Sequence, residues 1–169
     1  VELVQYNLGS IKQQWDKAKA LSGNAMNLKR FEDNSFDLVL LFGPMYHLRT
    51  KEEKAKALSE AKRVAKKDGV ILVAYIMNEY SVLSYAFFEK NINKCLENGQ
   101  LSPDFHVIPT DEDVYFFVRL EDMEELNEMV GLERIQVIAA DGPANHFRQV
   151  LNSLSEEEFM HFVEYHLAT

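Results

Sequence analysis

The residues best placed to do chemistry follow a short apolar run. Residues 36–42 (FDLVLLF) are apolar apart from one acid, and Gly43 and Pro44 end the run just before Tyr46 and His47. Glycine lets a ligand lie close to the backbone, and proline fixes the direction in which the chain leaves. Histidine exchanges a proton near neutral pH, so His47 is a candidate general base. The pattern predicts the floor of a binding pocket.

The elements around this loop form a strand–helix–strand unit. The run over 36–42 is typical of a strand covered on both faces, as in parallel sheets. Thr50 and Glu53 form a capping box that begins a helix over about 52–66. Residues 70–76 (VILVAYI) predict a second buried strand, parallel and adjacent to the first. Open α/β sheets bind ligands beyond the carboxyl ends of their strands, which is where the loop after the first strand lies.

Further along the chain, the apolar period switches between helix and strand several times. Alternation over 132–140 predicts a third strand of the same sheet. The other expected elements are helices over 81–96, 122–130, 144–151 and 155–167, and a short strand over 114–120. The predicted fold class is therefore α/β with a parallel sheet.

Composition argues against several classes of partner. The 169 residues carry a formal net charge of -9, and basic residues cluster only at 62–63 and 66–67, so a phosphate backbone would be repelled and no nucleic acid is expected. No apolar run approaches the roughly 20 residues of a membrane span. The single cysteine, Cys95, excludes an internal disulfide and fits a reducing, cytoplasmic environment.

The remaining histidines are too scattered along the chain to suggest a metal site. They are His106, His146, His161 and His166. No metal is therefore expected.

Two long segments together resemble a known family. Residues 23–48 (GNAMNLKRFEDNSFDLVLLFGPMYHL) and 57–76 (ALSEAKRVAKKDGVILVAYI) resemble class I S-adenosylmethionine-dependent methyltransferases, above all the small bacterial ones with a GPxYHL segment. The resemblance covers roughly residues 1–76 and extends more loosely through 137–151. It implies a Rossmann-like three-layer sandwich, S-adenosyl-L-methionine as cofactor and S-adenosylhomocysteine as product.

The resemblance assigns the nucleoside end of the cofactor to two segments. In VELVQYN, Glu2 would accept hydrogen bonds from the ribose hydroxyls and Leu3 would pack on the adenine. In GNAMNL, Asn24 replaces the commoner Asp and would accept from the adenine amino group, while the backbone N–H of Ala25 reaches the ring. The alternatives are a solvated terminal charge for Glu2 and a turn-forming residue for Asn24.

The same resemblance assigns the methionine end of the cofactor to the backbone of Leu41, Phe42 and Gly43. It places Tyr46 and His47 at the rim where the acceptor approaches. His47 can act there as a general base or simply hold the loop after the strand. We favour the second role, because methyl transfer from a sulfonium is largely a matter of positioning.

One part of the family pattern is missing from the sequence. The glycine-rich loop that follows the family's first strand has no counterpart among the seven glycines, no two of which form G-x-G. That loop is expected before Val1 and the last strand after Thr169, so the prediction is a fold truncated at both ends. Residues 1–169 would then be a single, partial domain, with 77–130 as a lid over the acceptor. Tyr75, Asn78 and Tyr80 are expected near the pocket.

The predicted function is methyl transfer to a small-molecule acceptor. The alternatives are a methyltransferase-like binding or regulatory module without catalysis, and another nucleotide-binding α/β enzyme, such as a nicotinamide-dependent one. A missing central strand would leave an exposed sheet edge beside residues 36–42, through which a homodimer could form.

Overall fold

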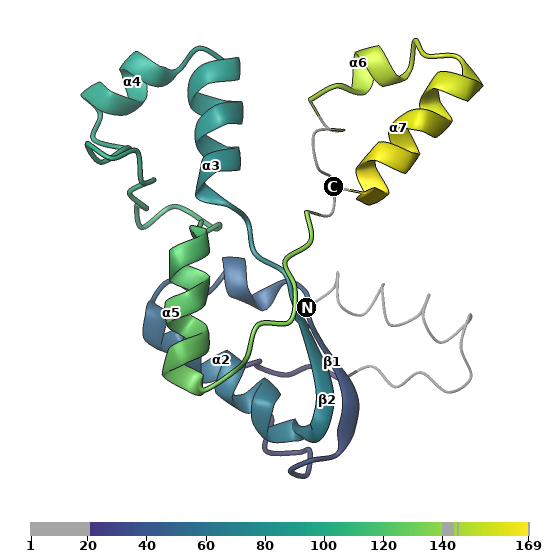
Figure 1. Ribbon diagram of the computed structural model, residues 1–169. Coiled ribbons are helices and arrows are strands. Elements are labelled where there is room, and N and C mark those ends of the chain that lie inside the picture. The colour runs from purple at the N-terminus through teal and green to yellow at the C-terminus, as the bar shows by residue number, and fades with distance from the viewer. Residues whose placement is uncertain (1–20, 140–143, 145, 169) are drawn as a thin grey trace. The chain divides into compact units, whose positions relative to one another are not determined.

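The computed structural model describes residues 21–139, 144 and 146–168. Contacts divide the chain between residues 133 and 134 into two compact units. In the first unit, strands β1 (Phe36–Leu41) and β2 (Ala65–Val73) lie side by side in parallel, and helix α2 (Lys51–Val64) connects them (Figure 1). The predicted strand–helix–strand unit and the α/β class are confirmed.

Helix α2 begins at the predicted capping box. The Thr50 side chain accepts from the Glu53 backbone N–H at 3.1 Å, and the Glu53 carboxylate accepts from the Thr50 N–H at 3.1 Å. The helix ends at Val64, slightly earlier than predicted, because Ala65 is already extended. Its buried face carries small and branched residues, which let the helix lie close against the sheet.

The two strands pair regularly only along part of their length. The regular register runs from Leu38 opposite Val70 to Leu41 opposite Val73, and the preceding residues of β2 form a bulge. Gly69 closes this bulge, where an added Cβ would lie 3.0 and 3.1 Å from backbone oxygens of β1. A larger residue would push the strands apart, so glycine is required here by close approach. The predicted strand over 70–76 ends earlier, at Val73.

The two faces of the sheet differ in how much of their surface is exposed to solvent. Side chains of Val39, Leu41, Ile71 and Val73 belong to the core against α2. The opposite face, here called the outer face, is apolar but 38–59% exposed in the described part of the chain. Its residues are Leu38, Leu40, Phe42, Val70 and Leu72. In place of the expected three layers, the described residues form the sheet and one helical layer.

Helix α5 (Leu120–Val130) adds Leu126 to the main core, in which Leu58 and Met45 are fully buried. The helix ends at Gly131 with φ +64, the left-handed conformation that glycine adopts without strain. Lys62 of α2 donates to the carbonyls of Val130 and Gly131 at 2.7 and 2.8 Å. The predicted helix over 122–130 is confirmed.

A second, smaller core lies within residues 77–107. Helices α3 (Asn78–Ser81) and α4 (Ile92–Glu97) flank a π-helical segment, η2 (Val82–Phe88), around buried Val82, Ala86, Cys95 and Leu101. The prediction of one continuous helix over 81–96 is wrong. The chain turns at Lys90, whose φ of 59° is left-handed and interrupts the helical hydrogen bonds.

Two predicted strands are also wrong. Within residues 114–120, Val118 forms an isolated parallel bridge with Met77, and Leu120 already belongs to α5. The described residues of 132–140 are not a strand, and Ile135 and Ile138 are 81% and 74% exposed. Alternation predicts which side chains share a face, but a strand also needs an edge to pair with, and these residues pair with none in the described part of the chain.

The second unit contains helices α6 (Arg148–Leu151) and α7 (Glu156–Ala168). The predicted capping box before α7 is confirmed, because Ser155 and Glu158 exchange hydrogen bonds between side chains and backbone N–H groups. The helix predicted over 144–151 is shorter than expected. Among the described residues, no helix has the length and apolar character needed to cross a membrane.

Candidate functional site

The loop after β1 has an open backbone. Gly43 adopts φ 131°, a backbone conformation that is strained for any residue with a side chain. A Cβ added at Gly43 would have the Tyr46 hydroxyl as its nearest contact, at 3.8 Å. The next residues form a 3₁₀ turn, η1 (Pro44–Tyr46), anchored by fully buried Met45. The anchored turn holds the backbone on either side of Gly43 in place and leaves space above it.

A distant segment lies over this loop. Residues 110–118, here called the strap, contact it through backbone and side chains. The Nδ1 atom of His47 donates to the Val114 carbonyl at 2.8 Å, and the Phe116 N–H donates to the Tyr46 carbonyl at 2.9 Å. The rings of Tyr46, His47 and Tyr115 form one cluster, with centroids 4.8 to 6.0 Å apart.

Two cations hold the strap from the side of α2. The Arg49 guanidinium donates to the Thr110 carbonyl at 2.7 Å, pairs with Asp111 at 3.1 Å, and lies 5.2 Å from the centre of the Phe116 ring. Lys54 lies 5.6 Å from the same ring and donates to the Leu48 carbonyl. Burial lowers the pKa of Lys54, as expected for an ammonium group taken out of water.

The segment predicted to meet the adenine forms a tight turn. The side-chain oxygen of Asn24 accepts from the Met26 N–H at 2.9 Å, and its carbonyl accepts from the Asn27 N–H at 2.9 Å. Asn24 therefore has the turn-forming role, and the second lone pair of its amide oxygen stays available. Ala25 packs against the main core with Leu41, so these predicted site residues come together. An open hollow of about 220 Å³ lies beside the turn, lined by Leu21, Gly23, Asn24, Ala25, Asn27, Leu28, Arg30 and Phe31.

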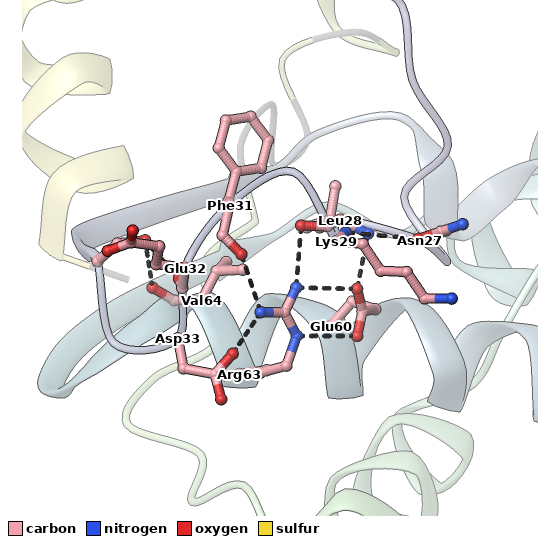
Figure 2. A network of polar contacts seen from close by, with 10 residues as sticks. Asn27, Leu28, Lys29, Phe31, Glu32, Asp33, Glu60, Arg63 and Val64 are labelled. Carbon is pink, nitrogen blue, oxygen red and sulfur yellow. Dashed lines mark hydrogen bonds and ion pairs between the residues drawn. The ribbon is translucent and has the colours of Figure 1, made fainter.

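A partly buried ion pair between Glu60 and Arg63 fastens this segment to α2 (Figure 2). Arg63 donates to the carbonyls of Leu28 and Phe31 at 2.9 and 3.0 Å and pairs with Asp33 and Glu60. The Glu60 carboxylate also accepts from the Leu28 N–H at 2.6 Å. The Arg63 hydrogen bonds and then the Leu28 N–H lower the pKa of Glu60 to about 2. Hydrogen bonds to the carboxylates of Glu60 and then Asp33 raise the pKa of Arg63.

Other predicted site residues lie in different places. Glu2 and Leu3 are outside the described residues. Tyr75 packs against the main core just beyond β2, and burial raises its pKa to about 12. Asn78 is buried, but it bonds to the Phe105 carbonyl at 3.0 Å and the Val107 N–H at 2.9 Å, on the side of the second core. Tyr80 is exposed.

Sequence reasoning missed the strap and the ion pair. Val114 and Tyr115 were expected in a strand, and their contact with His47 joins residues 67 positions apart, which no local pattern encodes. Glu60 and Arg63 are three positions apart on α2, as in an ordinary surface pair. On α2 this pair lies next to Ala57 and Ala61, which are buried. Its position beside the apolar face of the helix was the feature of the sequence that could have indicated a partly buried pair.

Among the described residues, no group of three His, Cys, Asp or Glu side chains could hold a metal ion.

Comparison with known proteins finds a match for the segment that contains the Gly43 loop. Residues 1–73 match the family model described as a methyltransferase domain. The predicted methyltransferase resemblance is thereby confirmed at the level of the domain, and β1, α2 and β2 all lie within the matched residues.

A solved structure is similar to this chain over a larger range of residues. It is described as a SAM-dependent methyltransferase, possible histamine N-methyltransferase, from Thermotoga maritima, with 23% sequence identity and a TM-score of 0.47. The similarity covers 76% of this chain and 52% of that chain, so the chain spans about half the length of the protein it matches. No match was found among curated proteins.

Proposed function

We propose that the chain takes part in S-adenosylmethionine-dependent methyl transfer to a small-molecule acceptor, with S-adenosylhomocysteine as product. The observation that carries this proposal is the match of residues 1–73 to a methyltransferase domain. The matched residues include the parallel β1–α2–β2 unit and the Gly43 loop at its carboxyl edge, where open α/β sheets bind ligands.

The residues of the loop fit the methionine end of the cofactor. The space above Gly43 lets a ligand approach the backbone of Phe42 and Gly43, and buried Leu41 fixes where that backbone lies. When bound, S-adenosylmethionine supplies a methyl group on a sulfonium. The chain's own contribution is to hold that group beside the acceptor, because positioning accounts for much of the rate of such a transfer.

The turn at residues 24–27 fits the nucleoside end. The Asn24 amide oxygen can accept from the adenine amino group in addition to the Met26 N–H, and Ala25 lies next to the core that supports Leu41. In this proposal Glu2 takes the ribose hydroxyls and Leu3 the adenine face. Tyr46 and His47 take the acceptor side, and residues 77–130 serve as the acceptor-binding insertion. Support for the insertion comes from the contacts of the strap with Tyr46, His47 and Arg49.

Calorimetric titration with S-adenosylhomocysteine tests the proposal. Gly43→Ala strains the loop by about 1–3 kcal/mol and should weaken binding about tenfold or more. Gly99→Ala is the matched control: Gly99 also has a positive φ, 65°, and its added Cβ would contact nothing within 4 Å. Equal affinity of the two variants would remove the Gly43 loop from the site.

Assays of S-adenosylhomocysteine release from S-adenosylmethionine, with candidate acceptors present, test the transfer itself. Binding of S-adenosylhomocysteine without methylation of any acceptor would favour the alternative of a non-catalytic binding module. Absence of binding at millimolar concentration would reject the proposal.

A further inference from the structure

We propose that the strap completes the acceptor site by fixing which nitrogen of His47 receives the acceptor's proton. This inference rests on the proposed methyl transfer. It specifies the acceptor as a planar group that carries an N–H or O–H donor.

The contact with Val114 determines the tautomer of His47. A carbonyl oxygen only accepts hydrogen bonds, so Nδ1, 2.8 Å from the Val114 oxygen, must carry a hydrogen. A neutral imidazole has one N–H, which leaves Nε2 with a free lone pair. Within the described part of the chain, Nε2 forms no hydrogen bond. His47 therefore holds the loop through one nitrogen and offers the other as a base.

The position of the Val114 carbonyl is set by contacts on both sides of it. Beyond Val114, Phe116 is 6% exposed and donates its N–H to Tyr46. Before it, the Thr110 carbonyl accepts from Arg49 at 2.7 Å. Because the strap is held at both ends, Val114 acts as a positioning residue for His47.

The free lone pair and the neighbouring rings define the acceptor's chemistry. An unprotonated ring nitrogen binds a hydrogen-bond donor, so the group that meets Nε2 carries N–H or O–H. Tyr115 lies 5.2 Å from the His47 ring and is 48% exposed, which leaves part of its ring open to a second aromatic group. Aromatic pairs prefer offset or tilted stacking at such spacings, so a planar acceptor gains contact with Tyr115 while its donor reaches Nε2.

The chemical step then balances. The acceptor's nitrogen or oxygen forms a bond to the methyl carbon, and the electron pair of the methyl–sulfur bond stays with sulfur. The acceptor's N–H or O–H bond breaks, and the proton passes to Nε2 of His47.

Nitrogen NMR of the His47 ring tests the tautomer directly. With the signals assigned by comparison with His47→Gln, the neutral ring of the unaltered chain should be in the Nδ1–H form. Arg49→Gln removes the contacts with Thr110 and Asp111, and should produce a mixture of tautomers without changing S-adenosylhomocysteine affinity. A dominant Nε2–H form in the unaltered chain would overturn the proposal.

Three small-molecule probes separate the contribution of the hydrogen-bond donor from that of the planar ring. Phenol has both an O–H donor and a planar ring, anisole has the ring without the donor, and cyclohexanol has the donor without a planar ring. Phenol should bind about fivefold more tightly than either, as a single net hydrogen bond or ring contact predicts, with His47 ring signals as the readout. The advantage over cyclohexanol should disappear in Tyr115→Leu.

The outcomes distinguish this inference from the proposed function. Equal binding of phenol and anisole, or no binding of phenol, would overturn the inference even where S-adenosylhomocysteine binds. The expected order of probes without any S-adenosylhomocysteine binding would support acceptor recognition by His47 and Tyr115, and would reject methyl transfer.

Discussion

Replacing Glu60 by glutamine removes the charge at the centre of the contacts that hold residues 28–33 to α2, while size and shape stay nearly the same. The glutamine can still accept from the Leu28 N–H through its oxygen. Its amide nitrogen then faces the Arg63 guanidinium, and two donors cannot bond each other. Glu60→Gln should therefore destabilise the chain and loosen the turn that lines the hollow.

The magnitude follows from the pKa of Glu60, which its contacts lower from 4.5 to about 2. At about 1.4 kcal/mol per unit of pKa, a lowering of about 2.5 units means that the contacts with the charged form stabilise the fold by at most about 3.5 kcal/mol. Asp33, on the far side of Arg63, is 66% exposed, so water screens part of this network. We expect a loss of about 1.5–2.5 kcal/mol, in the range of hydrogen bonds to charged groups.

Urea unfolding at neutral and acidic pH measures this effect. Because the folded pKa of Glu60 lies below the unfolded one, its contribution is present above about pH 4.5 and is lost as the pH falls toward about 2. The stability difference between the unaltered chain and Glu60→Gln should therefore shrink over that interval. The matched control is Glu32→Gln, in the same segment, where the exposed carboxylate forms no side-chain hydrogen bond within the described residues. Equal stability of the two variants at neutral pH would refute the reasoning.

Leu58 is fully buried between α2 and the sheet, so Leu58→Ala should cost about 2–5 kcal/mol in urea unfolding, whereas the same change at exposed Leu83 should cost far less. Thr50→Ala breaks the capping box of α2 and should lower the free energy of unfolding by about 1 kcal/mol; no change would mean that the box adds nothing to the helix. Burial raises the pKa of Tyr75 to about 12, so unfolding should become easier as the pH rises above about 10, where the unfolded tyrosine ionises. Tyr75→Phe should weaken this alkaline dependence, and ultraviolet titration should show one tyrosine that ionises late.

The sequence predicted the elements whose signals are local. A continuous apolar run after a turn predicts a strand over residues 36–42. The capping box and the apolar face that follows it both predict a helix where α2 lies. The parallel pairing followed from the length of the connecting helix, since a crossover of this kind returns the chain in the same direction.

The errors arose where distant residues decide the structure. Nothing in the composition of 81–96 marks Lys90 as left-handed, because lysine rarely adopts that conformation. Residues 132–140 do alternate in the way typical of a strand, but the described ones have no strand to pair with in the described part of the chain. The strap over His47 depends on hydrogen bonds between backbone groups, whose donors and acceptors are the same for almost every residue type.

The apolar outer face of β1 and β2 also bears on how the chain behaves in concentrated solution. In the described part of the chain, Leu38, Leu40, Phe42, Val70 and Leu72 present a continuous apolar surface, whereas the whole chain carries a net charge of -9. Repulsion between like-charged molecules opposes contact between such surfaces, and it is screened within about 8 Å at physiological ionic strength. Added salt therefore removes the repulsion while leaving the apolar attraction. Colloidal stability of this chain should be greatest in dilute salt at neutral pH, and salting-out should begin earlier than its acidic composition alone implies.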